Sequence, residues 1–484
     1  FYLMRLWTDT PRADCGKEMY DVTGIFYPDV DLALGPDDAD LSLVHLEEEA
    51  GSLRTTSLKL SGLLQAEAVY TDPVLPDPVR DKRLCKRRLK LALYQLLKDA
   101  KGIQPPWGAL TGIPPTRLVC AKMAEGMDRE EGLAHVGEEY DVTPQKTSLL
   151  GMAVKAQQSL EKAGDDEVDL YIGIPFCESR CRYCSFISAQ VGNGQLLEPY
   201  TRALEGEIAA VIRLIREKKL RPRAFYMGGG TPTALNPVQL DRVLQAAKPL
   251  IDACRESTVE AGRPDSMTRE RLEVINRHGI SRISVNPQTV HDVTLELIGR
   301  RHTHAQTEEA FGLARSMGFD HINMDLIAGL PGETPDMFRR TLDWVKRSSP
   351  ESLTVHTLCV KRSSDMHRWQ DSLPPGEAVE EMVSMGLEAA LSLGMQPYYL
   401  YRQKHMAGNL ENVGYARPGM ECLYNVDTME DTLSVLAMGA GGISKRVTPG
   451  RVMVYRAANV KEISQYIGRA EEMAQRKRDL WSDI

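Results

Sequence analysis

Short apolar runs alternate with longer amphipathic segments through the middle of the chain. The short runs have the length and composition of buried strands, and they lie at residues 170–175, 224–229, 257–262, 282–287, 321–329 and 352–358. The longer segments carry apolar residues at helical spacing, and they lie at residues 197–218, 237–251, 269–278, 305–317 and 336–346. Strands that alternate with helices in this way form a parallel sheet with right-handed crossovers. The pattern therefore predicts an α/β fold with a partial (β/α)6 barrel.

The segments on either side of this repeat have different patterns. The first part of the chain combines strand-like stretches, such as residues 56–72, with helices, and the polar stretch at residues 164–169 is suited to a linker. Beyond residue 360 the pattern is mostly helical, and the charged segment at residues 461–480 predicts an exposed helix. The expected domains are an N-terminal α+β accessory domain (1–163), the barrel (164–360) and a mostly helical C-terminal domain (361–484).

A helix-like stretch from Asp81 to Ala100 has a basic face. Leucines form its apolar side, and six Lys or Arg residues between positions 82 and 90 supply the charge. Such a run is most often a solvated face, and the alternatives are docking of an RNA or of an acidic substrate. The net charge of −8 over 484 residues argues against general nucleic-acid binding.

Cysteine usage and hydropathy indicate the compartment. Six of the nine cysteines are scattered and three are clustered, which is unlike a disulfide framework. No apolar run approaches the roughly 18 residues of a membrane span, and the first residues lack a signal-peptide pattern. We therefore expect a cytoplasmic protein, and Phe rather than Met at position 1 indicates a trimmed N-terminus.

Three cysteines follow the first barrel strand at a C-x3-C-x2-C spacing. Cys177, Cys181 and Cys184 lie in one short loop directly after an apolar run. Three thiolates so placed can bind three irons of a [4Fe-4S] cluster and leave the fourth iron open for chemistry. A zinc site would usually need a second pair of Cys or His ligands, and buried core cysteines are the other alternative. The spacing favours the cluster.

Further polar residues recur where the barrel strands end. The glycine-rich stretch GGGTPT at residues 228–233 follows the second strand, and Glu260, Gln288 and Asp325 lie in or after the next three. A parallel barrel carries its active site on the loops that follow its strands. Core packing alone would not place these groups on one face, so we expect them to form one site with the cysteines.

Several stretches of the chain stand in the order of a known family. They are PWGALTG (106–112), YIGIPFCESRCRYCSF (171–186), GGGTPT (228–233), VEAGRPDSMT (259–268), ISVNPQT (283–289), IGRRHT (298–303), MDLIAGLPGET (324–334) and GYARPGMECLYN (414–425). The cysteine stretch resembles the radical S-adenosylmethionine (SAM) enzymes. The ordered set is similar to the oxygen-independent coproporphyrinogen III oxidase-like proteins of the HemZ type, and this resemblance covers essentially the whole chain.

The resemblance implies a radical SAM barrel with two cofactors, a [4Fe-4S] cluster on the three cysteines and SAM. In such enzymes SAM chelates the open iron, and one electron from the cluster cleaves it to methionine and a 5′-deoxyadenosyl radical. The residues expected at the cofactors are Tyr171, Tyr183, Gly228, Gly229, Gly230, Thr231, Glu260, Gln288, Arg300 and Asp325. Among these, the expected catalytic group consists of Tyr171, Gln288, Arg300 and Asp325, with the last three facing a second SAM or the substrate.

Each of these residues also has an ordinary structural interpretation. The glycines could form a plain tight turn, Glu260 could be a surface charge, and the tyrosines could be core residues. Arg300 could pair bidentately with a carboxylate of SAM or of a propionate, or it could form a structural salt bridge.

The activity that the resemblance implies is oxygen-independent oxidative decarboxylation of coproporphyrinogen III propionates to vinyl groups, giving protoporphyrinogen IX in heme biosynthesis. The implied partners are a tetrapyrrole substrate and a flavodoxin- or ferredoxin-type electron donor, and nucleic acid is not expected. Two alternatives stay open: a heme-binding chaperone, or a radical SAM enzyme that modifies another tetrapyrrole or RNA or acts as a methyltransferase. His302, His304 and His356 could bind a porphyrin or a heme iron, although structural histidines are commoner.

Overall fold

The computed structural model of the chain divides into two compact units. Unit 1 comprises Phe1–Gly151 and Arg402–Leu410, and unit 2 comprises Met152–Tyr401 and Glu411–Ile484. The structure describes residues 3–112, 114–186, 188–360, 364, 366, 373–403, 406–451 and 453–482. Across these residues, no helix is both long enough and apolar enough to cross a membrane.

Unit 1 contains a five-stranded mixed sheet and helices. The strand order is β2 (Asp31–Leu32), β1 (Arg5–Asp9), β3 (Leu41–Ala50), β4 (Leu53–Gly62) and β5 (Ala66–Pro73). β1 pairs in parallel with β2 and β3, whereas β4 is antiparallel to β3 and to β5. The helices are α1 (Gly16–Phe26), α2 (Pro78–Lys101), α3 (Pro115–Ala124) and α4 (Arg129–Tyr140), and α5 (Pro144–Ser159) crosses from unit 1 into unit 2. The N-terminal part thus has the α+β composition that the sequence predicts.

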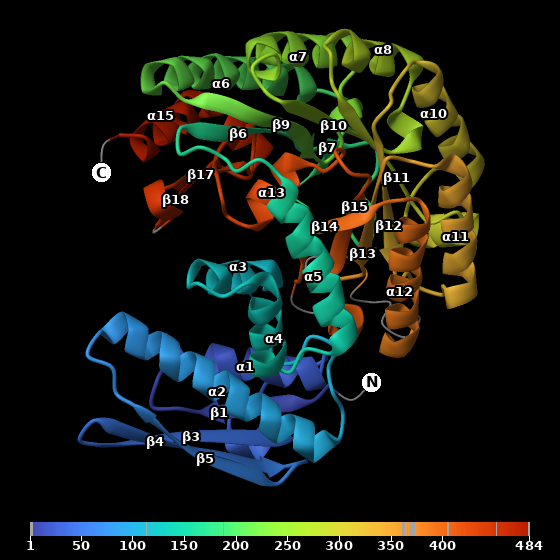
Figure 1. The fold of residues 1–484 in the computed structure, drawn as a ribbon. Coiled ribbons are helices and arrows are strands. Elements are labelled where there is room, and N and C mark those ends of the chain that lie inside the picture. The colour runs from blue at the N-terminus through green and yellow to red at the C-terminus, as the bar shows by residue number, and fades with distance from the viewer. Residues whose placement is uncertain are drawn as a thin grey trace. The chain divides into compact units, whose positions relative to one another are not determined.

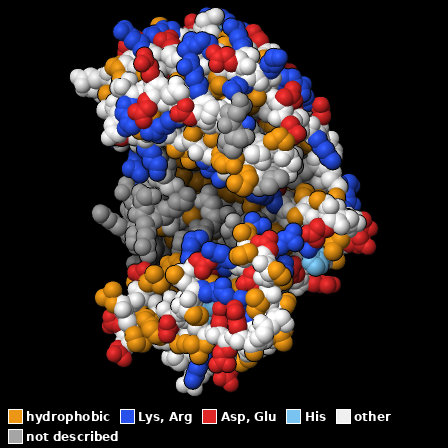
Figure 2. Space-filling model, turned by 90° about the vertical axis from the view of Figure 1, so that its left-hand side faces the viewer, with side chains coloured by type: hydrophobic (Ala, Val, Ile, Leu, Met, Phe, Trp, Pro, Cys, Tyr) orange, Lys and Arg blue, Asp and Glu red, His pale blue; other side chains and the backbone are white. Residues whose placement is uncertain are grey.

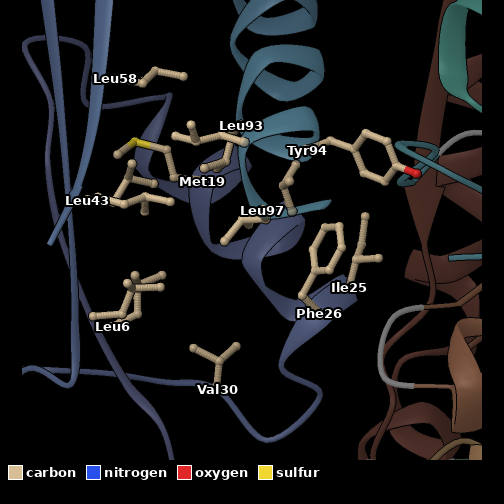
Figure 3. Packing of buried hydrophobic residues seen from close by; sticks show 14 of the residues in the cluster. Leu6, Met19, Ile25, Phe26, Val30, Leu43, Leu58, Leu93, Tyr94 and Leu97 are labelled. Carbon is tan, nitrogen blue, oxygen red and sulfur yellow. The ribbon is translucent and has the colours of Figure 1, made fainter. Parts of the chain in front are cut away.

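One hydrophobic core holds α1 and α2 of unit 1 against the sheet. Figure 3 shows Met19 of α1 and Leu93 and Leu97 of α2 gathered near Leu43 of β3. Leu89, Leu93 and Leu97 are spaced four residues apart, so they lie on one face of α2. Each fully buried Leu contributes roughly 1.5–3 kcal/mol, so this apolar face fixes the helix on the sheet.

The basic face of α2 is compensated within unit 1. Lys86 and Lys90 pair with Glu18 of α1 at 3.4 and 2.9 Å, and Arg88 pairs with Asp72 of β5 at 2.8 Å. On the face of the molecule that Figure 2 shows, Lys and Arg side chains likewise lie among Asp and Glu side chains. The positive charge of α2 is therefore locally neutralised, as expected for a solvated face rather than for an RNA-docking surface.

Unit 1 also includes a segment from late in the chain, Arg402–Leu410. The Arg402 guanidinium lies over the Trp107 ring, 5.6 Å from its centroid, and donates to the Leu110 carbonyl oxygen at 2.7 Å. It also donates to the backbone and side-chain oxygens of Asn409 at 2.9 and 2.7 Å. Because Trp107 and Leu110 belong to the stretch PWGALTG, that motif has a packing role in unit 1.

Unit 2 is built on one sheet of eleven strands, in the order β14-β15-β13-β12-β11-β10-β9-β6-β16-β17-β18. The parallel strands are β6 (Glu167–Ile174), β9 (Arg221–Gly229), β10 (Glu256–Gly262), β11 (Arg282–Gln288), β12 (Ile322–Ala328), β13 (Ser352–Thr357) and β16 (Ser434–Met438). The helices between them are α6 (Leu197–Lys218), α7 (Pro237–Ile251), α8 (Arg269–Arg277), α9 (Asp292–Leu297), α10 (His304–Ser316) and α11 (Pro335–Ser348). In Figure 1, α6, α7, α8, α10 and α11 line the outer side of the curved sheet. The predicted α/β fold with a partial barrel is confirmed.

The barrel helices begin at caps that the sequence specifies. Asn236 and Gln239 form a reciprocal capping box at the start of α7, and Thr303 and Gln306 form another at the start of α10. These caps satisfy backbone N–H groups that the first helical turn leaves unpaired. The limits predicted from periodicity, residues 237–251 and 305–317, agree closely with the observed limits of α7 and α10.

The C-terminal part adds strands to both edges of the barrel sheet. β14 (Gln396–Tyr401) and β15 (Asn412–Ala416) extend the edge at β13, and β17 (Ile443–Val447) and β18 (Val454–Ala458) continue from β16 at the other edge. Its helices are α12 (Gly376–Ser392), α13 (Leu423–Met429), α14 (Ile463–Gly468) and α15 (Ala470–Leu480). Strands from both sides of residue 361 lie in one sheet, and the domain limit expected there stays a prediction.

The sequence-based expectation of an exposed C-terminal helix is wrong for Lys477 of α15. The Lys477 ammonium is buried and donates to Glu207 Oε1 of α6 at 2.5 Å and to Asn459 Oδ1 at 2.8 Å. Glu207 Oε2 accepts hydrogen bonds from the Gly439 amide at 2.8 Å and from the Tyr466 hydroxyl at 2.5 Å. The partners of Lys477 are distant in sequence, so nothing in the charged run around it predicts that this lysine is buried.

Candidate active site

The cysteine loop begins where the barrel strand β6 ends. Its first residues form β7 (Phe176–Cys177), which pairs in parallel with β8 (Ala189–Gln190) and brings the two ends of the loop together. Inside the loop the Cys184 amide donates to the Cys181 carbonyl oxygen at 3.1 Å. The loop is therefore a fixed turn at the carboxyl ends of the parallel strands, where a barrel carries its active site.

The three thiols of this loop lie within electrostatic reach of one another. Burial raises the pKa of the Cys177 and Cys184 thiols, and neighbouring cysteine thiols add to both increases. In the described ranges, no three Cys, His, Asp or Glu side chains converge closely enough to hold a single metal ion. A [4Fe-4S] cluster binds its cysteines through different irons, so its ligands surround it instead of meeting at one point. Three cysteines in one loop are suited to hold three irons of such a cluster.

The glycine turn after β9 has no room for side chains. A Cβ at Gly228 would lie 2.7 Å from Glu260 Cδ, and a Cβ at Gly230 would lie 2.5 Å from the Phe176 carbonyl oxygen. Gly229 between them has a φ of +111°, which L side chains rarely adopt. The turn therefore packs against both the cysteine loop and the carboxylate on β10, which is a more specific arrangement than a plain tight turn. The next residue, Thr231, places its Oγ1 3.7 Å from Cys177 Sγ.

Three tyrosine rings stack beside the glycine turn. The Tyr226 ring centroid lies 6.4 Å from that of Tyr171 and 4.6 Å from that of Tyr424, with interplanar angles of 17° and 21°. The Tyr226 hydroxyl donates to Glu260 Oε1 at 2.6 Å. Burial raises the pKa of Glu260 to about 7, the hydrogen bond from Tyr226 opposes this increase, and nearby Asp325 adds to it. Glu260 is thus a half-buried carboxyl with a raised pKa, held by a hydrogen bond, and not an exposed surface charge.

Gln288 and Arg300 lie together at the end of β11. Gln288 is buried and has a φ of +65°, a conformation that is uncommon for a residue other than glycine. Arg300 donates from Nη1 to the carbonyl oxygens of Asn286 and Pro287. Gln288 Oε1, Asn286 Oδ1 and Arg300 Nε are buried and form no hydrogen bond to a described residue. This strand end therefore has unused capacity for polar contacts with a ligand.

Asp325 joins two barrel strands. Its Oδ1 accepts a hydrogen bond from Asn323 Nδ2 at 2.7 Å and lies 4.0 Å from His356 Nε2 of β13. Its effect on the pKa of Glu260 places the two carboxyl groups within electrostatic reach of each other. The structure thus brings together a group of polar side chains from β10, β12 and β13.

The remaining residues predicted for the site have mostly buried surroundings. Tyr183 packs against a hydrophobic cluster, and burial raises the pKa of its hydroxyl. His302 is buried, and its pKa is lowered to about 3 by burial and by Arg300. His304 packs edge-on against Trp344 at a ring distance of 5.0 Å, which is an ordinary structural environment.

Sequence reasoning missed four residues that the structure places at the site, namely Tyr226, Arg263, Asn323 and Tyr424. Arg263 Nη1 lies 3.7 Å from Cys181 Sγ and donates to the Ser179 carbonyl oxygen at 2.7 Å. Two of the four lie within motifs that are recognisable in the sequence, Arg263 in VEAGRPDSMT and Tyr424 in GYARPGMECLYN. For Arg263 and Tyr424, membership of a recognisable motif was the sequence signal that could have identified them. The contacts that place them at the site join residues far apart in the sequence and have no such signal.

The site fits a polar ligand bound beside a cluster. Glu260 and Asp325 are carboxyl groups of a type suited to amino or hydroxyl groups of a ligand. The unpartnered atoms of Gln288, Asn286 and Arg300 supply further donors and acceptors. These are the groups that the amino acid and ribose parts of SAM require.

Comparison with known proteins agrees with this geometry. Residues 171–345 match the family described as the Radical SAM superfamily. The chain is 35% identical over 475 residues to the oxygen-independent coproporphyrinogen-III oxidase-like protein HemZ of Bacillus subtilis (strain 168), covering 95% of this chain and 94% of that protein. The heme chaperone HemW of the same organism is 31% identical over 61% of this chain and 74% of its own length. The solved structure of coproporphyrinogen III oxidase (HemN) from Escherichia coli has a TM-score of 0.51 and 24% identity, covers 69% of this chain and 74% of its own, and supports the fold.

The barrel and its cysteine loop define the radical SAM class, whose members use a [4Fe-4S] cluster and SAM. The chain belongs to this superfamily, in the family of the coproporphyrinogen-III oxidase-like protein HemZ. The resemblance and the cofactors expected from the sequence are thereby confirmed.

Proposed function

We propose that this chain is a radical SAM oxidoreductase that converts propionate side chains of coproporphyrinogen III to vinyl groups without oxygen, giving protoporphyrinogen IX. The observation that carries this proposal is the match to a relative named for coproporphyrinogen-III oxidase along 95% of this chain. A match of that extent includes both units, whereas the cofactor chemistry alone would need only the barrel.

In this proposal the cysteine loop and the glycine turn hold the cofactors. Cys177, Cys181 and Cys184 are the cluster ligands, and the bound cofactors supply an oxidant that removes a hydrogen atom from the substrate. Gly228 and Gly230 let the turn pack closely against Glu260 and the cysteine loop, because side chains at these positions would collide with those neighbours. Glu260 binds amino or hydroxyl groups, and Tyr171 and Tyr183 line the site.

The polar groups of β11 and β12, together with Arg300 after α9, act on a second ligand in this proposal. Arg300 Nε donates to a carboxylate, either of a second SAM or of a propionate, and Gln288 Oε1 accepts from an N–H or O–H group of the same ligand, because both atoms are buried without a partner among the described residues. Asp325 orients the same ligand. The backbone contacts of Arg300 fix its guanidinium before the ligand arrives, which lowers the entropy lost on binding.

The electron source and the compartment belong to the same proposal. Each SAM cleavage needs one low-potential electron for the cluster, and a flavodoxin- or ferredoxin-type protein supplies such electrons. After hydrogen-atom removal and release of carbon dioxide, one electron remains on the substrate and passes to a one-electron acceptor. None of the nine cysteines, all of which the structure describes, forms a disulfide, which supports a reducing cytoplasm.

The test is anaerobic incubation of reconstituted protein with SAM, dithionite and coproporphyrinogen III. We expect carbon dioxide and a vinyl-bearing tetrapyrrole, detected by mass spectrometry, and we expect Cys177→Ala to abolish both. Cys120→Ala, at an exposed cysteine outside the loop, is the matched control and should retain activity. Formation of 5′-deoxyadenosine without any decarboxylated tetrapyrrole would refute the substrate and keep the enzyme class.

A second candidate is a heme chaperone, because HemW is 31% identical over 61% of this chain. Of the three histidines considered from the sequence, His356 is the one that lies within 4.0 Å of Asp325, a residue of the candidate site, and a carboxylate at that distance could orient it toward a heme iron. Tight heme binding that His356→Ala weakens and His304→Ala does not, together with absence of SAM cleavage, would favour this function.

A further inference from the structure

Arg263 is a buried guanidinium that faces the cysteine loop. It follows β10, and only 4% of its surface is exposed. Its Nη1 lies 3.7 Å from Cys181 Sγ and donates to the Ser179 carbonyl oxygen at 2.7 Å. Cys181 is the second cysteine of the motif, and Ser179 lies between it and the first.

The other two nitrogens of Arg263 have a different partner. Nε and Nη2 donate to the two carboxylate oxygens of Asp265 at 3.0 and 2.6 Å, a bidentate pair that fixes the plane of the guanidinium. Because this pair uses one edge of the guanidinium, the remaining nitrogen is held toward the cysteine loop. A structural salt bridge alone would not require Nη1 to point at a sulfur.

The backbone at Arg263 is also fixed. Ser266 Oγ donates to the Arg263 carbonyl oxygen at 3.0 Å, and the Thr233 hydroxyl donates to the Ala261 carbonyl oxygen at 2.7 Å. Thr233 and Ser266 are themselves within hydrogen-bond distance at 2.7 Å. The glycine-turn motif and the VEAGRPDSMT motif thus form one support for the guanidinium.

We propose that Arg263 sets the reduction potential of the cluster, through its positive charge and its N–H contact to the Cys181 sulfur. Reduction adds one electron from the donor to the cluster and moves no proton. The added negative charge is stabilised by a nearby cation and by hydrogen bonds to ligand sulfurs, both of which raise the potential of an iron–sulfur centre. Burial strengthens the effect because little water screens the charge. Arg263 is therefore a positioning and tuning residue and takes no part in bond making.

The test is an anaerobic redox titration of the reconstituted protein with dithionite, followed by electron paramagnetic resonance of the reduced cluster. The sample contains no tetrapyrrole, so its outcome is independent of the substrate proposed above. Arg263→Gln should reduce the equilibrium constant for reduction at least about tenfold, which is a potential lower by about 59 mV for one electron. Arg263→Lys, which keeps a charge but not the fork geometry, should shift the potential in the same direction and less.

Arg271→Gln is the matched control. Arg271 donates to the backbone oxygens of Leu235 and Ser266 at 2.9 and 3.3 Å, so its removal takes an equal charge from the same region without touching the sulfur contact. An unchanged potential in Arg263→Gln, or an equal shift in Arg271→Gln, would overturn the proposal.

Replacing Arg263 takes the bidentate partner from Asp265 and could disturb the cysteine loop. Iron content is therefore measured before each titration, to show that the cluster is present. The double variant Arg263→Gln/Asp265→Asn also removes the unpaired carboxylate, so its potential should lie below that of the unsubstituted protein and above that of Arg263→Gln. Failure of Arg263→Gln, Arg263→Lys and the double variant to hold the cluster would also overturn the tuning role, since the arginine would then serve only to fold the loop.

Discussion

The Tyr226 hydroxyl and the Glu260 carboxyl form a 2.6 Å hydrogen bond beside the glycine turn of the barrel. The bond joins neighbouring strands, β9 and β10, and holds Glu260 Oε1 in one position. Because burial raises the pKa of Glu260 to about 7 and this bond opposes the increase, Tyr226 controls both the orientation and the charge of the carboxyl.

This relationship predicts a pH dependence of SAM binding. Glu260 is neutral below its pKa and cannot then attract a cationic amino group, so affinity should rise as pH increases through about 7. Tyr226→Phe removes a hydrogen bond that lowers the pKa, and the midpoint should move to higher pH. Equilibrium SAM binding measured across neutral pH checks this. Tyr455→Phe on β18 is the control, and equal midpoints in all three proteins would contradict the prediction.

The close approach at the glycine turn predicts that Gly230→Ala damages the site. Its Cβ would lie 2.5 Å from the Phe176 carbonyl oxygen, so the cysteine loop must move. A displacement of about 1 Å can cost about 100-fold in rate, and we expect a loss of that order in SAM cleavage. Gly206→Ala on α6, where a Cβ meets nothing within 4 Å, is the control and should retain activity. Full activity of Gly230→Ala would show that the turn tolerates side chains.

The buried pair of Lys477 and Glu207 predicts a large stability effect near the C-terminus. Lys477→Met leaves a buried carboxylate without its cation, which typically costs about 3–5 kcal/mol. Lys477→Met/Glu207→Gln should restore part of that loss because no charge is then left unpaired. Urea unfolding monitored by tryptophan fluorescence measures both effects. Lys461→Met, at an exposed lysine, should change the unfolding free energy by less than about 0.5 kcal/mol.

Asp169 on β6 predicts a pH-dependent stability. Its side chain is fully buried, neither carboxylate oxygen accepts a hydrogen bond from the described residues, and burial raises its pKa well above the usual value. The folded state therefore holds a proton that the unfolded state loses above about pH 4, so this group lowers stability as pH rises. Asp169→Asn should accordingly stabilise the protein more at pH 8 than at pH 5, measured as the urea midpoint. Asp343→Asn, at an exposed position of α11, should show no such difference, and an equal effect of Asp169→Asn at both pH values would refute the assignment.

The sequence predicted the strands and helices, because these depend on local patterns of residues. The alternation of apolar runs with amphipathic segments identified six strands, β6 and β9 to β13. Caps such as Asn236 with Gln239 mark helix starts that can be read directly from the sequence. Contacts between distant residues had no such signal. Tyr226 and Tyr424 are 198 positions apart yet stack at 4.6 Å, and Lys477 meets a glutamate from a helix 270 positions earlier. The candidate site was predicted through motifs, while its hydrogen-bond partners depend on how the strands are ordered.

The segment Arg402–Leu410 limits how the protein can be divided experimentally. It stands between β14 and β15 of unit 2, but it packs with unit 1 through Arg402, Trp107 and Leu110. A fragment that ends at residue 151 would leave Trp107 without the guanidinium that covers it, and a fragment that begins at residue 152 would carry a strand connection without its hydrogen-bond partners. Unit 1 is thus built from two separate stretches of the chain, so a cut at residue 151 divides it.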